Sequence, residues 1–190
     1  MMPTIDRLKE AQILRRIQKG DDAAFTEAYD IYAPKLWKHA YYRTGAKEHA
    51  DDILSETFLK AWEFVRERSK EIQHLRAFLY RVSNNLIIDH YRRNARAPIP
   101  MDEDIERTLS DDTEIELDTD LKIESEKMRQ ALLTLKIDVR ELLVMRFIDD
   151  LTIEEISIAT GKTKNAVYVS IHRAVKELKN VCSEITISIN

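Results

Sequence analysis

The stretch TIEEISIATGKTKNAVYVSIHRAVKELK, residues 152–179, decides the fold of the C-terminal part of the chain. It predicts two short helices separated by one tight break. Thr152 lies three residues before Glu155, which is the spacing of a capping box, where a hydroxyl and a carboxylate satisfy each other's backbone donors. Gly161 is a residue at which a helix ends readily, and Thr163 is a candidate N-cap for the second helix.

The second helix of this stretch has one apolar and one basic face. Its apolar residues recur at helical spacing: Val167, Ile171, Ala174, Val175 and Leu178. Its opposite face carries Lys164, Tyr168, His172, Lys176 and Lys179. A short helix, a turn with glycine and a helix with a basic outer face form the sequence pattern of a DNA-binding helix-turn-helix. The alternative is an ordinary amphipathic hairpin with a solvated basic face.

The composition favours an all-α protein made of two small helical domains. The chain has 190 residues, 44% of them hydrophobic, with only 3 Gly and 4 Pro. No apolar run approaches the roughly 20 residues that span a bilayer, and the N-terminus lacks an apolar signal core. We therefore expect a cytoplasmic protein without membrane insertion. The single cysteine excludes an internal disulfide framework and a thiolate metal cage.

The net charge of −4 conceals an uneven distribution of charge along the chain. Residues 1–101 have a net charge of +4, residues 102–126 a net charge of −10, and residues 127–190 a net charge of +2. The acidic stretch follows Pro98 and Pro100 and contains only isolated apolar residues, which is typical of a flexible linker rather than a packed element. Two mildly basic helical domains are therefore expected on either side of an acidic linker.

A helix expected over residues 47–68 carries an acidic ladder. Its apolar stripe is regular, with Leu54, Phe58, Ala61, Trp62 and Val65. Glu48, Asp52 and Glu56 repeat every four residues on another face, where like charges repel each other. A solvated face, a metal site that includes His49, and a docking surface for a basic partner are the three explanations.

The next helix, expected over residues 75–96, combines cations, amides and aromatics. Cations near its C-terminus complement the helix dipole. The dipole does not explain why Arg81, Asn84, Asn85 and Tyr91 occur on the same helix. Arg and Asn contact phosphates and base edges, and aromatics stack on unpaired bases, so we expect nucleic-acid contact here.

The remaining elements are less distinctive. A first helix over residues 5–19 places Leu8, Leu14 and Ile17 on its apolar side. The following helix is expected to kink or restart at Pro34, which lacks an amide donor. The tail, residues 181–190, is compatible with a frayed end or a docked strand.

With these elements in order, the sequence resembles the small extracytoplasmic-function (ECF) group of bacterial sigma factors. The family's opening pattern is matched by GDDAAF at residues 20–25, and its polymerase-docking motif by ADDILSETF at residues 50–58. The promoter-melting motif is matched by RAFLYR and NNLIIDHYRR at residues 76–81 and 84–93. LTIEEI at residues 151–156 fits the family's helix-turn-helix.

The resemblance implies a domain plan and a function. Region two would occupy residues 1–97, the acidic linker residues 98–122, and region four residues 123–190. The protein would bind core RNA polymerase, at the clamp of the largest subunit and the flap of the second-largest, and direct it to promoter DNA. It would be no enzyme and would use no cofactor, metal or small-molecule substrate. Family members are commonly held inactive by an anti-sigma factor, which adds a candidate partner.

The resemblance also assigns three sets of site residues. The polymerase-binding set comprises Asp51, Asp52, Leu54, Glu56, Phe58 and Trp62. The minus-ten set comprises Arg81, Asn84, Asn85, Asp89, Tyr91, Arg92, Arg93 and Arg96. The minus-thirty-five set comprises Lys164, Asn165, Tyr168, His172, Arg173 and Lys176. The family usually has a small or basic run where residues 168–170 read Tyr-Val-Ser, so an unusual upstream element is expected.

Two other classes are weighed against this hypothesis. A stand-alone helix-turn-helix regulator would bind duplex DNA as a dimer, but no zipper-like repeat is present and the docking motif would have no purpose. A carboxylate–metal enzyme would use Glu48, His49, Asp52 and Glu56, but the sequence contains no matching second cluster of ligands.

Overall fold

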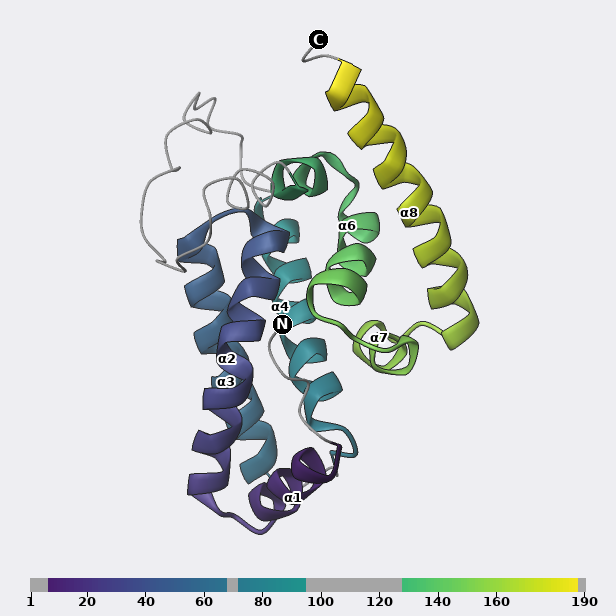
Figure 1. Cartoon of the computed structure of the whole chain (residues 1–190). Helices are drawn as coiled ribbons and strands as arrows, with labels where there is room; N and C mark the ends of the chain where they lie inside the picture. Colours follow the sequence, from purple (N-terminus) through teal and green to yellow (C-terminus); the bar gives the residue numbers. More distant parts are fainter. Residues whose placement is uncertain (1–6, 68–71, 95–127, 188–190) are drawn as a thin grey trace, which may run out of the picture.

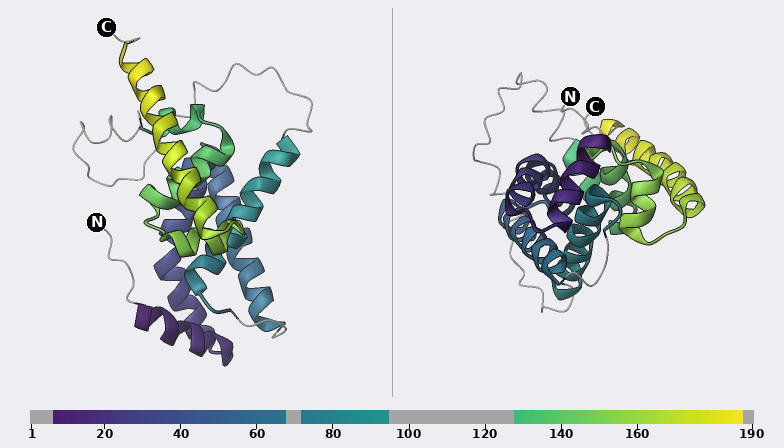
Figure 2. Two further views of the ribbon diagram at one scale, coloured as in Figure 1. Left: turned by 90° about the vertical axis from the view of Figure 1, so that its right-hand side faces the viewer. Right: turned by 90° about the horizontal axis from the view of Figure 1, so that it is seen from below.

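The computed structural model describes residues 7–67, 72–94 and 128–187, and the regular elements of this part of the chain are all helical. They are arranged as in Figures 1 and 2. The elements are α1 (Arg7–Gln18), α2 (Asp22–Thr44), α3 (Lys47–Arg66), α4 (Leu75–Asn94), α6 (Ile137–Leu143), a π-helical turn η2 (Val144–Ile148), α7 (Ile153–Thr160) and α8 (Lys164–Ile187). A further helical stretch covers residues 128–134. The all-α expectation is confirmed, while the linker, residues 98–122, lies outside the described residues.

Helices α2, α3 and α4 run alongside one another, and α1 crosses one end of them (Figure 1). The predicted stripe of α3 faces this bundle, with Phe58 and Ala61 buried and Leu54 and Val65 packed against the core. Both ends of α2 are capped. Asp21 precedes it, and Gly45 ends it in a left-handed conformation with φ of 81°.

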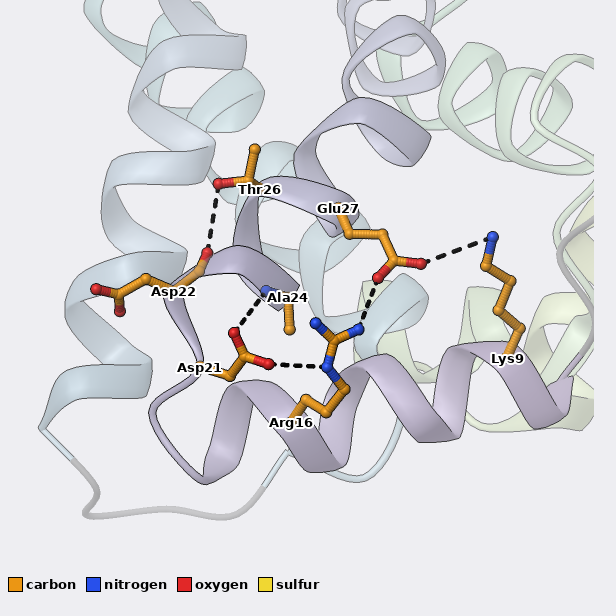
Figure 3. A network of polar contacts seen from close by, with 7 residues as sticks. All are labelled: Lys9, Arg16, Asp21, Asp22, Ala24, Thr26 and Glu27. Carbon is orange, nitrogen blue, oxygen red and sulfur yellow. Dashed lines mark hydrogen bonds and ion pairs between the residues drawn. The ribbon is translucent and has the colours of Figure 1, made fainter.

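A polar network holds α1 across the start of α2 (Figure 3). Asp21 accepts a hydrogen bond from the backbone amide of Ala24 at 3.2 Å, which is the N-cap contact. Arg16 of α1 donates to Asp21 and to Glu27, each at 2.8 Å. The hydrogen bond from Arg16 lowers the pKa of the Asp21 carboxyl group below its ordinary value. The cap of one helix is thus also the anchor of the other.

Three expectations about local structure need correction. Helix α2 passes through Pro34 without a restart. Pro34 has no amide hydrogen to donate to the carbonyl of Asp30, and both residues are solvent-exposed. Leu8 is 71% exposed, because it lies six residues from the buried Leu14 and so on another face of a 3.6-residue helix. The tail is neither frayed nor a strand up to Ile187, since α8 continues to that residue.

The helix-turn-helix is confirmed in detail. Thr152 accepts from the amide of Glu155, and the Glu155 carboxylate accepts from the amide of Thr152 at 2.8 Å, which completes the capping box. Gly161 ends α7 with φ of 71°. Thr163 accepts from the amide of Ala166 at the start of α8. Val167, whose side chain is fully buried, begins the predicted apolar stripe of that helix.

Replacing Thr152 by alanine is expected to lower the free energy of unfolding by about 1 kcal/mol, because the amide of Glu155 loses its side-chain acceptor. Thr152→Ser keeps the hydroxyl and should unfold at nearly the wild-type denaturant concentration. Urea unfolding followed by circular dichroism measures both. Equal losses of unfolding free energy in the two variants would contradict the assignment of Thr152 as the N-cap.

The two halves of the chain share one hydrophobic core. A single cluster contains Tyr32 and Leu79 from the N-terminal bundle and Met145 and Ile156 from the C-terminal half. Helix α7 packs along α4, and η2 packs on α2. The helix-turn-helix therefore lies directly against the N-terminal bundle (Figure 2). None of the described helices is long and apolar enough to cross a membrane.

Candidate polymerase and DNA interfaces

The acidic residues of α3 lie on its outer surface. Asp51 and Asp52 are exposed, and Asp51 accepts a hydrogen bond from the indole of Trp37 at 2.7 Å. Glu56 is half-buried and pairs with Lys60 at 3.1 Å, one turn further along the helix. This arrangement leaves Asp52 exposed at the centre of the ladder.

The apolar members of the polymerase-binding set face inward. Phe58 is buried, and Leu54 and Trp62 are half-buried. Trp62 meets the ring of Phe25 at 4.8 Å in an edge-on contact. These side chains therefore fix α3 against α2, and the exposed carboxylates of the same helix present the charged surface.

Helix α4 presents five members of the minus-ten set to solvent. They are Arg81, Asn85, Asp89, Arg92 and Arg93. Asp89 and Arg92 form an ion pair at 3.6 Å, with both side chains mostly exposed. Arg96 lies outside the described residues.

The two other members of the minus-ten set are engaged inside the molecule. Asn84 is buried, and its amide oxygen accepts a hydrogen bond from the guanidinium of Arg43 at 2.8 Å. The hydroxyl of Tyr91 donates to the backbone carbonyl of Arg43 and accepts from Arg140 at 3.0 Å. Burial lowers the pKa of Arg43, a fully buried residue.

All six members of the minus-thirty-five set are exposed along α8, whereas Val167 and Ile171 of the same helix are buried. Lys164 pairs with Glu154 of α7 at 2.6 Å, and this contact lowers the pKa of Glu154. Tyr168, 57% exposed, lies edge-on to His172 with ring centroids 5.4 Å apart. The surface combines cations, an amide and an aromatic ring, which are the groups that contact phosphates and base edges.

A shallow groove between α3 and α4 contains His49 and His90, whose rings are 4.2 Å apart, together with Asp52 and Glu56. Burial and the neighbouring His49 lower the pKa of His90. Within residues 7–67, 72–94 and 128–187, no three His, Cys, Asp or Glu side chains are grouped so that they could hold a metal ion.

Comparison with known proteins decides between the classes of function. The model of "Sigma-70 region 2" matches residues 28–97, and the model of "Sigma-70, region 4" matches residues 125–178. The RNA polymerase sigma factor YlaC of Bacillus subtilis is 30% identical over 80% of this chain and 88% of its own length. The chain belongs to the ECF sigma factor family. The resemblance inferred from the sequence motifs is thereby confirmed, in preference to a stand-alone regulator or a metal enzyme.

A further relative is similar to this sigma factor in sequence, and a solved structure is similar to it in fold. The ECF RNA polymerase sigma factor BldN of Streptomyces coelicolor is 28% identical over 91% of this chain, which spans 66% of the length of BldN. The structure of the sigma factor RpoE in complex with the anti-sigma factor NepR from Bartonella quintana has the same fold. Its TM-score is 0.63 at 17% identity, covering 84% of this chain and 96% of that chain.

Two groups of buried polar side chains join the two halves of this sigma factor and were not expected from the sequence. One contains His39, Arg76 and Asp149, the other Arg43 and Arg140, all buried. His39 and Arg43 lie on the stripe of α2 that also buries Tyr32 and Leu36, so helical spacing alone could have shown that both face the interior. The identity of their partners depends on contacts between residues distant in the chain.

Proposed function

We propose that this sigma factor binds core RNA polymerase through α3 and brings it to promoters that α4 and α8 contact. The proposal is carried by one observation: the exposed carboxylates of α3 and the exposed cations of α4 and α8 occur on three separate helices of one chain. Charge of opposite sign steers partners to a surface and fixes their orientation. Residues 1–97 would form region two, residues 98–122 the linker and residues 123–190 region four.

Promoter opening in this proposal depends on α4. Arg81, Arg92 and Arg93 would contact phosphates, and Asn85 would reach base edges, because it is exposed whereas Asn84 is buried. Bases taken out of the stack would be held next to α4, and their capture would offset an opening cost of a few kcal/mol. No ATP hydrolysis is needed for such a step.

Upstream recognition depends on α8, which would lie in the major groove. Tyr168 and His172 would contact bases, and Arg173 and Lys176 phosphates. The acidic linker would occupy a basic channel of the polymerase, as its net charge of −10 over residues 102–126 suggests. Unchanged initiation and abortive synthesis after neutralisation of its carboxylates would contradict that role.

An anti-sigma factor is a further proposed partner. The Bartonella quintana RpoE chain, which shares this fold, is bound to the anti-sigma factor NepR. A cytoplasmic protein that encounters polymerase in the cell would need such a partner to be kept inactive until a signal arrives.

The direct test of the proposed function is co-purification. Tagged full-length protein, expressed in a bacterium, should retain the large subunits of core polymerase through washes at moderate salt, detected by mass spectrometry. A tagged chain that retains no polymerase subunit would contradict the proposal.

Replacing Arg173 by alanine is expected to weaken binding of the holoenzyme to promoter fragments and to reduce the slope of log affinity against log salt by about 1. The physical reason is the loss of one phosphate contact. Arg15→Ala removes an exposed arginine of α1 and should change neither quantity. The same salt slope for Arg173→Ala and wild type would place this residue outside the DNA interface.

A further inference from the structure

Two histidines from different helices meet in the groove between α3 and α4. His49 lies in the first turn of α3, and His90 lies near the C-terminal end of α4. The two helices pack against each other (Figure 1), and the ring centroids of the two histidines are 4.2 Å apart. Both side chains are half-buried, so a small solute can still reach them. Neither histidine belongs to the sets assigned to polymerase or DNA.

The contact leaves one ring nitrogen unsatisfied. The two ring planes are tilted by 59°, so the rings do not stack face to face. Nδ1 of His49 is buried and makes no hydrogen bond to any group in the described part of the chain. Buried polar atoms are usually paired, because an unpaired one costs free energy. A bound ligand would give this nitrogen a partner.

The charge of the groove suits a metal cation. Burial, followed by the neighbouring His49 and Arg93, lowers the pKa of His90. His90 is therefore neutral near neutral pH, and neutral imidazole is the form that binds metal ions. Asp52 lines the same groove and adds negative charge. Arg93 opposes a cation, but it is exposed, so its guanidinium can extend into solvent.

The separation of the rings is close to that of two imidazoles on one ion. Zn²⁺ binds an imidazole nitrogen at about 2.0–2.1 Å, which places the ion about 3.2 Å from the ring centroid. Two imidazoles at an angle of about 90° to 110° around the ion then have centroids about 4.5–5 Å apart. The observed 4.2 Å is slightly shorter. Small rotations about χ2, a soft torsion in histidine, would bring both rings onto one ion.

Asp52 is the candidate third ligand. It follows His49 by three residues, so the two side chains lie on the same face of α3. It lines the groove with both histidines, and its charge acts on the pKa of His90. As the side chains stand, no three His, Cys, Asp or Glu among the described residues are grouped closely enough to hold a metal ion. Asp52 would therefore turn toward the histidines when an ion binds.

We propose that His49 and His90 bind one divalent transition-metal ion, represented by Zn²⁺, and that Asp52 turns toward them as the third ligand. Imidazole suits Zn²⁺, Cu²⁺ and Ni²⁺, and an ion held from two helices would join α3 to α4. The effect of the ion rests on the proposed function, because Asp52 belongs to the polymerase-binding set. A bound ion would neutralise this carboxylate and weaken docking, so the ion would regulate the sigma factor without taking part in any reaction.

Zinc titration of the full-length free chain tests the site. A reference chain carries Cys182→Ser, which removes the thiol, and is titrated with Zn²⁺ near neutral pH in an isothermal calorimeter. We expect one ion per chain at the tightest site. In this background, His49→Gln and His90→Gln should each bind the ion at least about tenfold more weakly, because each loses a ligand. His74→Gln is the matched control, since His74 is exposed and lies outside the groove; it should bind as the reference does.

Thermal unfolding gives a second readout of the same site. Zn²⁺ should raise the unfolding temperature of the reference and of His74→Gln more than that of the two groove variants. Circular dichroism without metal checks that each variant is folded, and His49→Asn replaces His49→Gln if the latter is not. Equal zinc binding by all four chains would overturn the site, because the ion would then be held elsewhere, for example by the acidic stretch. A reference chain that binds no single ion tightly would overturn it as well.

Polymerase binding tests the regulatory consequence separately. Saturating Zn²⁺ should weaken binding of the reference chain to core polymerase about tenfold, because the charge of one interface carboxylate is cancelled. His90→Gln should bind polymerase equally with and without the ion, which also controls for effects of Zn²⁺ on polymerase itself. Zinc binding with unchanged affinity for polymerase would overturn the regulatory role. If no chain bound polymerase with or without the ion, the proposed function would be contradicted, while the titration of the free chain would still decide the metal site.

Discussion

Unfolding of the Asn84→Ala variant is expected to require about 3 kcal/mol less free energy than unfolding of the wild type. The amide oxygen of Asn84 is the acceptor for the guanidinium of Arg43, which is fully buried. The other guanidinium nitrogens of Arg43 have no hydrogen-bond partner among the described residues. Loss of Asn84 would therefore leave a buried cation without an acceptor, which costs more than the loss of a neutral hydrogen bond.

Asn85→Ala is the matched control, because the same change occurs one residue along α4 at an exposed position. Its free energy of unfolding in urea should equal that of the wild type within about 0.5 kcal/mol, while promoter opening by the holoenzyme should weaken. Equal stability of the two variants would contradict the structural role of Asn84. Equal promoter opening by Asn85→Ala and wild type would contradict the base contact proposed for Asn85.

Core polymerase should bind the double variant Asp52→Lys, Glu56→Lys about 100-fold more weakly than the wild type, since like charges brought together at an interface cost several kcal/mol. Asp52 is exposed on α3, and Glu56 is partly exposed beside Lys60. Fluorescence anisotropy of labelled protein titrated with core polymerase measures the affinity.

Single charge reversals provide the control for this experiment. Asp52→Lys and Asp30→Lys change the net charge equally, but Asp30 lies on α2, outside the acidic ladder. Only Asp52→Lys should weaken binding to polymerase, and thermal unfolding should show that both variants are folded. A double variant that retains wild-type affinity would show that the acidic face of α3 is not the docking surface.

Local signals in the sequence predicted much of the fold. The capping box of Thr152 and Glu155, the end of α7 at Gly161 and the buried stripe that begins at Val167 all follow from interactions within a few residues. Helical spacing could also have shown that Asn84 faces inward, because it lies four residues after Tyr80 and three before Ile87, both fully buried.

The contacts between the two halves could not be predicted in this way. His39 and Asp149 are 110 residues apart in the chain, and neither residue type nor spacing identifies the partner of the other. The same holds for Arg140, which reaches Tyr91 across 49 residues of sequence. Such pairs are set by how the helices pack, and packing depends on the whole chain.

Transcription of fragmented genomic DNA by core polymerase, with and without this protein, tests the central claim most directly. Sequencing of the RNA 5′ ends would identify the initiation sites. We expect new sites that share two sequence elements upstream of the start, and we expect them to disappear with the Asp52→Lys, Glu56→Lys variant. The same set of 5′ ends with and without the wild-type protein would contradict its assignment as a promoter-directing sigma factor.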